Sequence, residues 1–256
     1  MGRAVLPSAL LALAGLAQIA GEGPAIALGL LFFLAGTAHG AGDEQDGTIR
    51  PYRLAPAVAY VVAGLAVAAL FVALPLAGLT LFLLLSAWHF AHSSGGTWPR
   101  RLGFALTAIG ASALWQNAAT GRVFAAVLGT PIPPLWMLAL AIIGAIGLGL
   151  SAWALKDDWR DGALWVTLVA TAILHPVLAV GLAFAVGHAL PIQRAQLRRY
   201  GWRRVLFAEG VTTGLAILGA LAIAASVLTG HLALPLAAAL AFGMATPHML
   251  AERLER

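Results

Sequence analysis

The chain contains seven histidines, and six of them lie within a long apolar segment or at its end. These six are His39, His89, His92, His175, His188 and His248. An ionisable side chain inside a bilayer is costly, so such residues usually face a bundle interior and are paired or functional. Neutral imidazole is also a good ligand for iron, zinc or copper. These histidines are therefore the first candidates for chemistry, whereas His231 lies in a Thr-Gly-His turn and is expected at an interface.

Four of the histidines lie close to the C-terminal end of their apolar segment: His39, His89, His188 and His248. With the span count derived below, all four ends reach the cytoplasmic side. Four imidazoles at one depth would suit a transition metal. The alternative for each of them is a simple hydrogen bond to a neighbouring helix.

Residues near these histidines suggest supporting roles. Asp43 follows His39 by four residues, one turn on if the helix continues, and could orient the imidazole from outside a metal site. Alternatively, Asp43 simply begins an acidic loop. His89 and His92 share a helix face at i and i+3, a spacing that can chelate a metal but is common. His175 precedes Pro176 and is expected to mark a helix break, lining the interior or bonding freed carbonyls.

The composition indicates which class of protein must position these side chains. Hydrophobic residues make up 61% of the chain and charged residues only 10%, against about 25% charged in soluble domains. We therefore expect an all-α, polytopic integral membrane protein forming a single domain over residues 1–256, with the lipid bilayer as its surroundings. The net charge of +5 comes from arginines between apolar runs, which is typical of membrane topology and does not indicate nucleic-acid binding. The absence of cysteine excludes disulfides and thiolate metal sites.

The apolar segments and the arginines between them give a topology. The segments cover residues 4–20, 25–41, 55–74, 76–93, 102–119, 135–154, 163–190, 206–229 and 232–250, and 121–134 and 191–204 are expected to be irregular. Arg100 and Arg101, and the five arginines between 194 and 204, should all be cytoplasmic. Either 102–119 or 163–190, which Pro176 divides, must then cross incompletely or twice. The prediction is about eight transmembrane helices in the inner (plasma) membrane, with both termini cytoplasmic.

Four short motifs in this order resemble those of one family. Ala38–Asp43 resembles a PHGxxD element, and Ser86–Phe90 resembles an SxxHFG element. Pro176–His188 has the spacing of a segment leading to an HSxRH element, and Thr246–Met249 resembles a PHM element. Together these elements resemble the Brp/Blh-type β-carotene dioxygenases of bacteria and archaea, over residues 30 to 250 or so.

The resemblance implies a membrane-embedded enzyme that uses Fe(2+) and O2 to split β-carotene at its central double bond, giving two retinal molecules. His39, His89 and His188 match the family's catalytic, iron-ligating histidines, and Asp43 matches the aspartate beside the first. His248 matches the histidine of the PHM element and is a further metal candidate. The lipophilic carotenoid would enter from the bilayer along apolar and aromatic side chains, for which the candidates are Trp88, Phe90, Trp115 and Phe184.

The chain departs from the family pattern at two places. Ile192 stands where the family has a second histidine, four residues after His188, and Ser94 replaces an aspartate. Pro191 is expected to bend or end the helix at the point where the missing ligand would project. His92 or His248 could restore a fourth ligand. The departures leave open retained cleavage, an altered carotenoid oxygenation, or carotenoid binding without turnover.

A histidine-lined transporter or proton channel is the alternative from another class. It predicts histidines spread through the membrane depth, whereas four of them here lie near segment ends. The only lysine is Lys156, in a loop, so no span can carry a retinal Schiff base. A zinc hydrolase of the usual kind is a more distant reading, because the HExxH pattern is absent.

Overall fold

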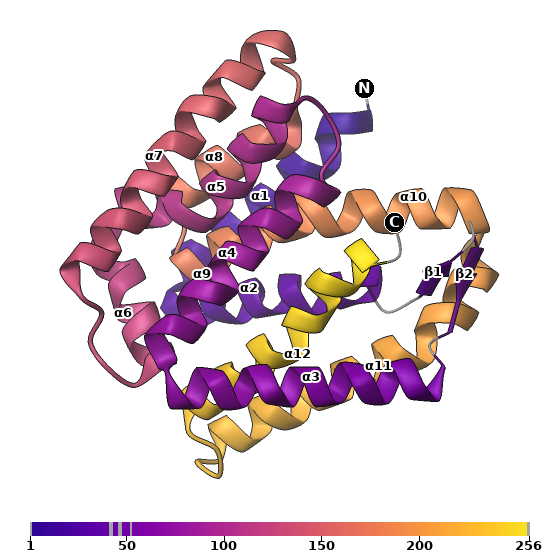
Figure 1. Cartoon of the computed structure of the whole chain (residues 1–256). Helices are drawn as coiled ribbons and strands as arrows, with labels where there is room; N and C mark the ends of the chain where they lie inside the picture. Colours follow the sequence, from indigo (N-terminus) through magenta and orange to yellow (C-terminus); the bar gives the residue numbers. More distant parts are fainter. Residues whose placement is uncertain (1, 41–42, 46–47, 52, 255–256) are drawn as a thin grey trace. The chain divides into compact units, whose positions relative to one another are not determined.

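The computed structural model describes residues 2–40, 43–45, 48–51 and 53–254, and side chains for 5–38, 49–51 and 53–249. These residues are helical apart from turns and one short hairpin (Figure 1). The helices are α1 (Gly2–Ala20), α2 (Glu22–Gly36), α3 (Leu54–Ala73), α4 (Pro75–Ser93), α5 (Trp98–Trp115), α6 (Asn117–Leu128), α7 (Pro134–Asp157), α8 (Gly162–Ile173), α9 (Pro176–Phe184), α10 (Leu190–Tyr200), α11 (Trp202–Leu228) and α12 (Leu234–Leu254). A 3₁₀ turn (Thr37–Gly40), a π turn (Ala185–Ala189) and strands β1 (Asp43–Gln45) and β2 (Thr48–Arg50) complete the described elements.

The all-α, membrane-protein class predicted from composition agrees with the lengths of these helices. Among the described residues, 5 helices are long and apolar enough to cross a bilayer: Leu54–Ala73, Pro75–Ser93, Pro134–Asp157, Pro176–Tyr200 and Trp202–Leu228. Four further apolar helices are shorter: Val5–Ala20, Glu22–Gly36, Gly162–Ile173 and Leu234–Met249. Many large apolar side chains on these helices are exposed, as expected where lipid and not water covers the surface. The count of eight spans stays a prediction.

The chain forms two compact units, and its histidines are divided between them. The first comprises Met1–Gly36, Ser86–Ala125 and Pro131–Pro191, and the second comprises Thr37–Leu85, Ala126–Thr130 and Ile192–Arg256. His89 and His188 belong to the first unit, and His39 and His248 belong to the second. The prediction of one domain over the whole chain stays a prediction.

Small residues bring α5 and α7 into close contact in the first unit. A Cβ added at Gly144 would overlap the backbone of Gly110, so neither position has room for a larger residue. Beside this crossing, the hydroxyls of Thr107 and Ser151 lie 3.1 Å apart in the buried interface. Small residues let backbones approach where lipid provides no hydrophobic driving force between helices. The α5–α7 pair is therefore closely packed along this crossing.

The predicted break at Pro176 is confirmed, since α8 ends at Ile173 and α9 begins at Pro176. Helix ends leave backbone carbonyls without partners, which is costly away from water. The side chain of Gln116 donates to two of these carbonyls, at 3.1 Å to Thr171 and 2.7 Å to Leu174. Gln116, just after the end of α5, thus stabilises the break between α8 and α9.

Pro191 was expected to bend or end its helix, and an end there, with an irregular stretch over 191–204, is wrong because the helix continues through α10 to Tyr200. Proline lacks an N–H and its ring clashes with the carbonyl four residues earlier in a regular α-helix. Here a π turn lies just before the proline, where the N–H of Leu190 bonds the carbonyl of Ala185, five residues back. The wider turn relaxes the geometry that would exclude proline. The other loop predicted, 121–134, is also helical as far as Leu128.

The second unit centres on α3 and α12, which cross at Gly64 and Gly243. The Tyr60 hydroxyl donates to the carbonyl of Met244 at 2.7 Å and ties the two helices together. The predicted helical turn from His39 to Asp43 is not formed. The 3₁₀ turn ends at Gly40, and Asp43 begins β1, opposite Arg50 in β2. A short acidic hairpin therefore follows His39, as in the alternative interpretation of Asp43.

Candidate metal centre

Two of the predicted site histidines meet in the first unit. The Nε2 atoms of His89 and His188 lie 3.0 Å apart, although 99 residues separate them along the chain. His89 comes from α4 and His188 from the π turn, and the side chains are only 4% and 1% exposed. Their rings meet edge to face, with centroids 4.7 Å apart. A buried imidazole pair of this kind is the strongest chemical feature of the described residues.

The π turn gives His188 its position. π turns are uncommon insertions in helices and occur often at functional sites. Gly187 precedes the histidine, and a Cβ there would overlap the ring of Phe104 on α5. The turn can therefore lie against α5 only because residue 187 is glycine. This close contact fixes the backbone from which the His188 side chain extends.

Ser93, in the last turn of α4, determines which nitrogen of His188 carries a proton. Its hydroxyl donates to the carbonyl of His89 at 2.5 Å, and its oxygen lies 3.2 Å from Nδ1 of His188. A serine hydroxyl has one proton, so Ser93 must accept the second hydrogen bond from Nδ1–H. The Nε2 atom of a neutral His188 then presents its lone pair towards His89. Metal-binding imidazoles need this arrangement, with one nitrogen held by a partner and the other free to ligate.

The spacing of the two Nε2 atoms suits a shared metal ion. With metal–nitrogen bonds of about 2.1 Å, ligands at right angles have their nitrogens about 3.0 Å apart, and tetrahedral ligands about 3.4 Å. The observed 3.0 Å fits neighbouring positions of an octahedral ion such as Fe(2+). Within the described residues, no group of three or more potential ligands comes together. The pair could therefore offer two ligands to a metal, and further protein ligands would have to come from residues outside the pair.

Three predicted residues lie in the second unit. His39 is in the 3₁₀ turn and Asp43 is in β1, and the side chains of both fall outside the described residues. His248 lies in α12, one residue after Pro247, and is half-buried. Their approach to a common metal remains a prediction from the sequence.

His92 and His175 lie apart from the pair in structural roles. His92 is exposed, its Nδ1 donates to the Trp88 carbonyl at 2.8 Å, and its ring packs on Trp88. His175 caps α9, since its Nδ1 accepts the N–H of Val177 at 3.4 Å. Its Nε2 lies 3.5 Å from a carboxylate oxygen of Glu22. The break predicted at His175 is present, and its side chain stabilises the helix start there.

Aromatic rings surround His188 on its apolar side. Phe90 and Phe184 lie 4.9 Å and 5.6 Å from its ring, measured between centroids. Phe33 stacks on Phe184 at 5.4 Å and extends this wall. Two of the four predicted substrate-lining residues are thus beside the histidine pair. Trp115, by contrast, is 56% exposed.

Ser93 does not stand out in the sequence as a site residue. Its one available signal was its position four residues after His89, where a serine can bond the carbonyl of the preceding turn. The contact with His188 depends on tertiary packing, which no local pattern reveals.

Comparisons with models of known protein families, with curated proteins and with solved structures find no match. The function is therefore argued from the residues themselves.

Proposed function

We propose that this chain is a membrane-embedded, iron-dependent carotenoid oxygenase of the Brp/Blh type, with about eight spans and both termini in the cytoplasm. It would cleave β-carotene at the central double bond with O2 to give retinal. The observation that carries the proposal is the buried His89–His188 pair, with its Nε2 atoms 3.0 Å apart in apolar surroundings. The four ordered sequence motifs that contain His39, His89, His188 and His248 support it.

In this proposal, His39, His89 and His188 hold Fe(2+), with His248 as a further ligand and Asp43 orienting His39. When bound, the iron supplies the activation of O2, which a protein side chain alone cannot provide. The central double bond is broken, and each new aldehyde takes one oxygen atom of O2. No external reductant is required, in keeping with a sequence that has no nicotinamide or flavin motif.

The side chains around the histidine pair would orient His188 and exclude water from the site. Ser93 keeps Nδ1 of His188 protonated, so that Nε2 is available as a ligand. Phe90 and Phe184 exclude water and provide flat apolar surfaces against which a polyene can lie. A substrate dissolved in the bilayer needs no aqueous entrance, which suits a pair that is almost completely buried.

The transporter alternative fits this environment less well. Proton relays and ion pathways place histidines along a water-filled cavity. His89 and His188 are instead buried, and aromatic rings lie beside them. Carotenoid binding without cleavage and a modified oxygenation reaction are further alternatives, and the expression experiment described next distinguishes them from central cleavage.

The test is expression in cells that accumulate β-carotene, with retinal measured by chromatography. We expect bleaching and retinal with the wild-type chain, and loss of both in His39→Ala and His188→Ala. His231→Ala is the matched control, because that histidine is exposed and its Nδ1 contacts the Thr229 hydroxyl in its own turn, away from the pair. No bleaching, together with no iron in the purified protein, would overturn the proposal. Bleaching that survives His39→Ala and His188→Ala would overturn the assigned site. Bleaching without retinal would indicate a different cleavage position.

A further inference from the structure

A pocket of about 290 Å³ lies beside His188 in the first unit. The residues that matter in its wall are Ser93, Ser94, Gly95, Gly96, Arg100 and His188. They come from the end of α4, the turn after it and the start of α5, together with the π turn. The wall, which Gly187 and Pro191 complete, is partly apolar but includes two serine side chains and a guanidinium group, unlike the aromatic surroundings of His188. β-Carotene and O2 are both uncharged, so the proposed reaction does not explain this pocket.

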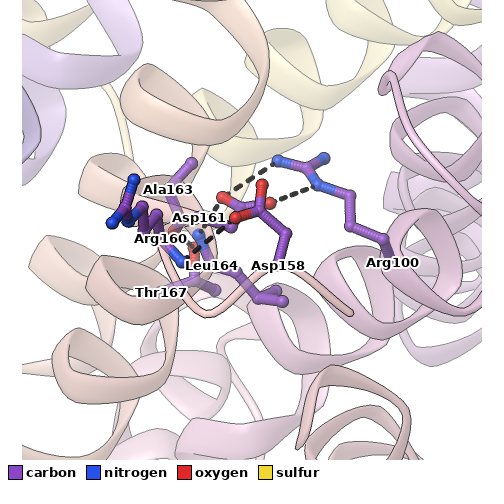
Figure 2. Close-up of polar contacts among 7 residues, drawn as sticks. All are labelled: Arg100, Asp158, Arg160, Asp161, Ala163, Leu164 and Thr167. Atoms are coloured by element: carbon purple, nitrogen blue, oxygen red, sulfur yellow. Dashed lines mark hydrogen bonds and ion pairs between the residues drawn. The ribbon is translucent and has the colours of Figure 1, made fainter. Parts of the chain in front are cut away.

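Arg100 brings hydrogen-bond donors to the pocket that the protein does not use. Its Nε donates to Asp161 at 2.8 Å, and one Nη2 hydrogen reaches the other carboxylate oxygen at 3.5 Å (Figure 2). A guanidinium has five N–H donors, so three remain without an acceptor among the described residues. Asp161 is not among the residues that line the pocket. The Arg100 guanidinium is thus held in place by the Asp161 carboxylate and can still donate hydrogen bonds to a second anionic group.

Ser94 is a second donor without a partner. It is 7% exposed, and its hydroxyl oxygen is buried with no hydrogen bond to any described residue. Leaving a buried hydroxyl without a hydrogen bond is unfavourable. A ligand atom with a free lone pair could accept a hydrogen bond from this hydroxyl and remove that cost. Gly95 and Gly96 form the adjoining wall without side chains, so a ligand can approach the backbone of the turn. Among the side chains that line the pocket, none is an acid.

We propose that this pocket binds a small oxyanion, a carboxylate or phosphate group, through Arg100 and Ser94. A charged acceptor satisfies both donors at once, and charge-assisted hydrogen bonds of this kind are about twice as strong as neutral ones. The pocket shares Ser93 and His188 with the proposed metal centre, but Arg100 and Ser94 belong to the pocket alone, so phosphate binding to them can be tested separately from carotenoid cleavage. The oxyanion can be a free solute or the phosphate of a lipid headgroup.

The direct test is equilibrium dialysis of the full-length, detergent-solubilised protein against radioactive inorganic phosphate, with ionic strength held constant by chloride. We expect one saturable site in the wild type. Ser94→Ala should weaken binding about tenfold, since it removes one hydrogen bond to a charged group. Arg100→Lys should weaken it by a similar factor, because lysine lacks the planar donor fork but keeps the charge that pairs with Asp161. Arg122→Lys, at an exposed position in α6, is the matched control and should bind as the wild type does.

No saturable binding at millimolar phosphate, or wild-type affinity in Ser94→Ala, would overturn the proposal. Ser94→Ala removes a hydroxyl that bonds to no described residue, so this variant should fold and decides the matter even if Arg100→Lys does not fold. A second arm repeats the dialysis in lipid nanodiscs. Phosphate binding that disappears in phosphatidylglycerol nanodiscs identifies a headgroup as the natural occupant, and binding that persists identifies a free anion.

Discussion

The hydroxyl oxygen of Ser93 lies 3.2 Å from Nδ1 of His188, while the other ring nitrogen of His188 faces His89. Because the Ser93 proton is used by the His89 carbonyl, this contact makes Nδ1 the protonated nitrogen. One serine thus connects the backbone of α4 to the side chain of the π turn. It orients an imidazole without being a metal ligand itself.

Replacing Ser93 by alanine should therefore weaken metal binding by about 10- to 100-fold, the range found when partners of ligating histidines are removed. Titration of metal-free protein with Co(2+), followed by visible absorption, measures this. Ser93→Thr keeps the hydroxyl and should restore most of the affinity. The prediction assumes the proposed metal site, and equal affinities in wild type and Ser93→Ala would contradict the role given to Ser93.

The His89–His188 contact should also be visible in the stability of the metal-free protein. Replacing either residue by phenylalanine leaves the other imidazole buried without its partner, which should lower the free energy of unfolding by about 1–3 kcal/mol. The double variant should lose less than the sum of the two single variants, since no orphaned nitrogen remains. Thermal unfolding in detergent measures the three changes, with His231→Phe as a control on an exposed histidine. Strictly additive losses would mean that the two rings do not interact.

Gly187 should tolerate no side chain, because a Cβ there would overlap the Phe104 ring. We expect Gly187→Ala to destabilise the protein by about 1–3 kcal/mol, the usual cost of overpacking a core. Gly149→Ala is the matched control, since nothing lies within 4 Å of a Cβ at that helical position. The control should unfold at or above the wild-type temperature, because alanine favours a helix over glycine. Equal melting temperatures for the two variants would show that the π turn does not need its close contact with α5.

Asp161 forms an ion pair and also caps a helix, and two different substitutions can distinguish these roles. Its carboxylate pairs with Arg100, and its Oδ1 also accepts the N–H of Leu164 and caps α8 (Figure 2). Asp161→Asn keeps a good cap but loses the charge, and should cost about 1 kcal/mol for a partly exposed ion pair. Asp161→Ala loses the cap as well and should cost about 1 kcal/mol more. Thermal unfolding compares the two, and Asp158→Asn in the neighbouring turn is the control. A loss in Asp161→Asn as large as in Asp161→Ala would mean that capping contributes nothing.

Much of the fold could be predicted from the sequence because apolar length is a strong signal. The long apolar runs around α3, α4, α7 and α11 predicted helices long enough to cross a bilayer, and the break at Pro176 followed from the chemistry of proline. Pro191 misled for the same reason, since its usual effect is avoided by a π turn that has no sequence signature of its own. The prediction of an irregular region after Gly121 was wrong as far as Leu128, because the glycine and arginine there are compatible with a short helix.

Two histidines of the candidate site could be singled out from the sequence, but their hydrogen-bond partners could not. His89 and His188 could be singled out because a histidine in an apolar helix is unusual. Their pairing, and the contact with Ser93, depend on how α4 packs against the π turn, which involves residues about a hundred positions apart. For Asp43 the sequence left two alternatives open, and the 3₁₀ turn and strand after His39 agree with the acidic loop and not with a continued helix.

Ile192 offers the most direct test of the family resemblance. It lies four residues after His188 in the continuous helix Pro176–Tyr200, where the resemblance predicts a second histidine. If the chain is a divergent member that has lost one ligand, Ile192→His should strengthen metal binding, by about tenfold or more for one additional imidazole. Gln193→His is the matched control, because the next residue in a helix projects about 100° away and cannot reach the same ion. Co(2+) titration distinguishes the two variants. Equal affinities in Ile192→His, Gln193→His and the wild type would mean that position 192 does not face the metal, and that the fourth ligand must be sought at His248.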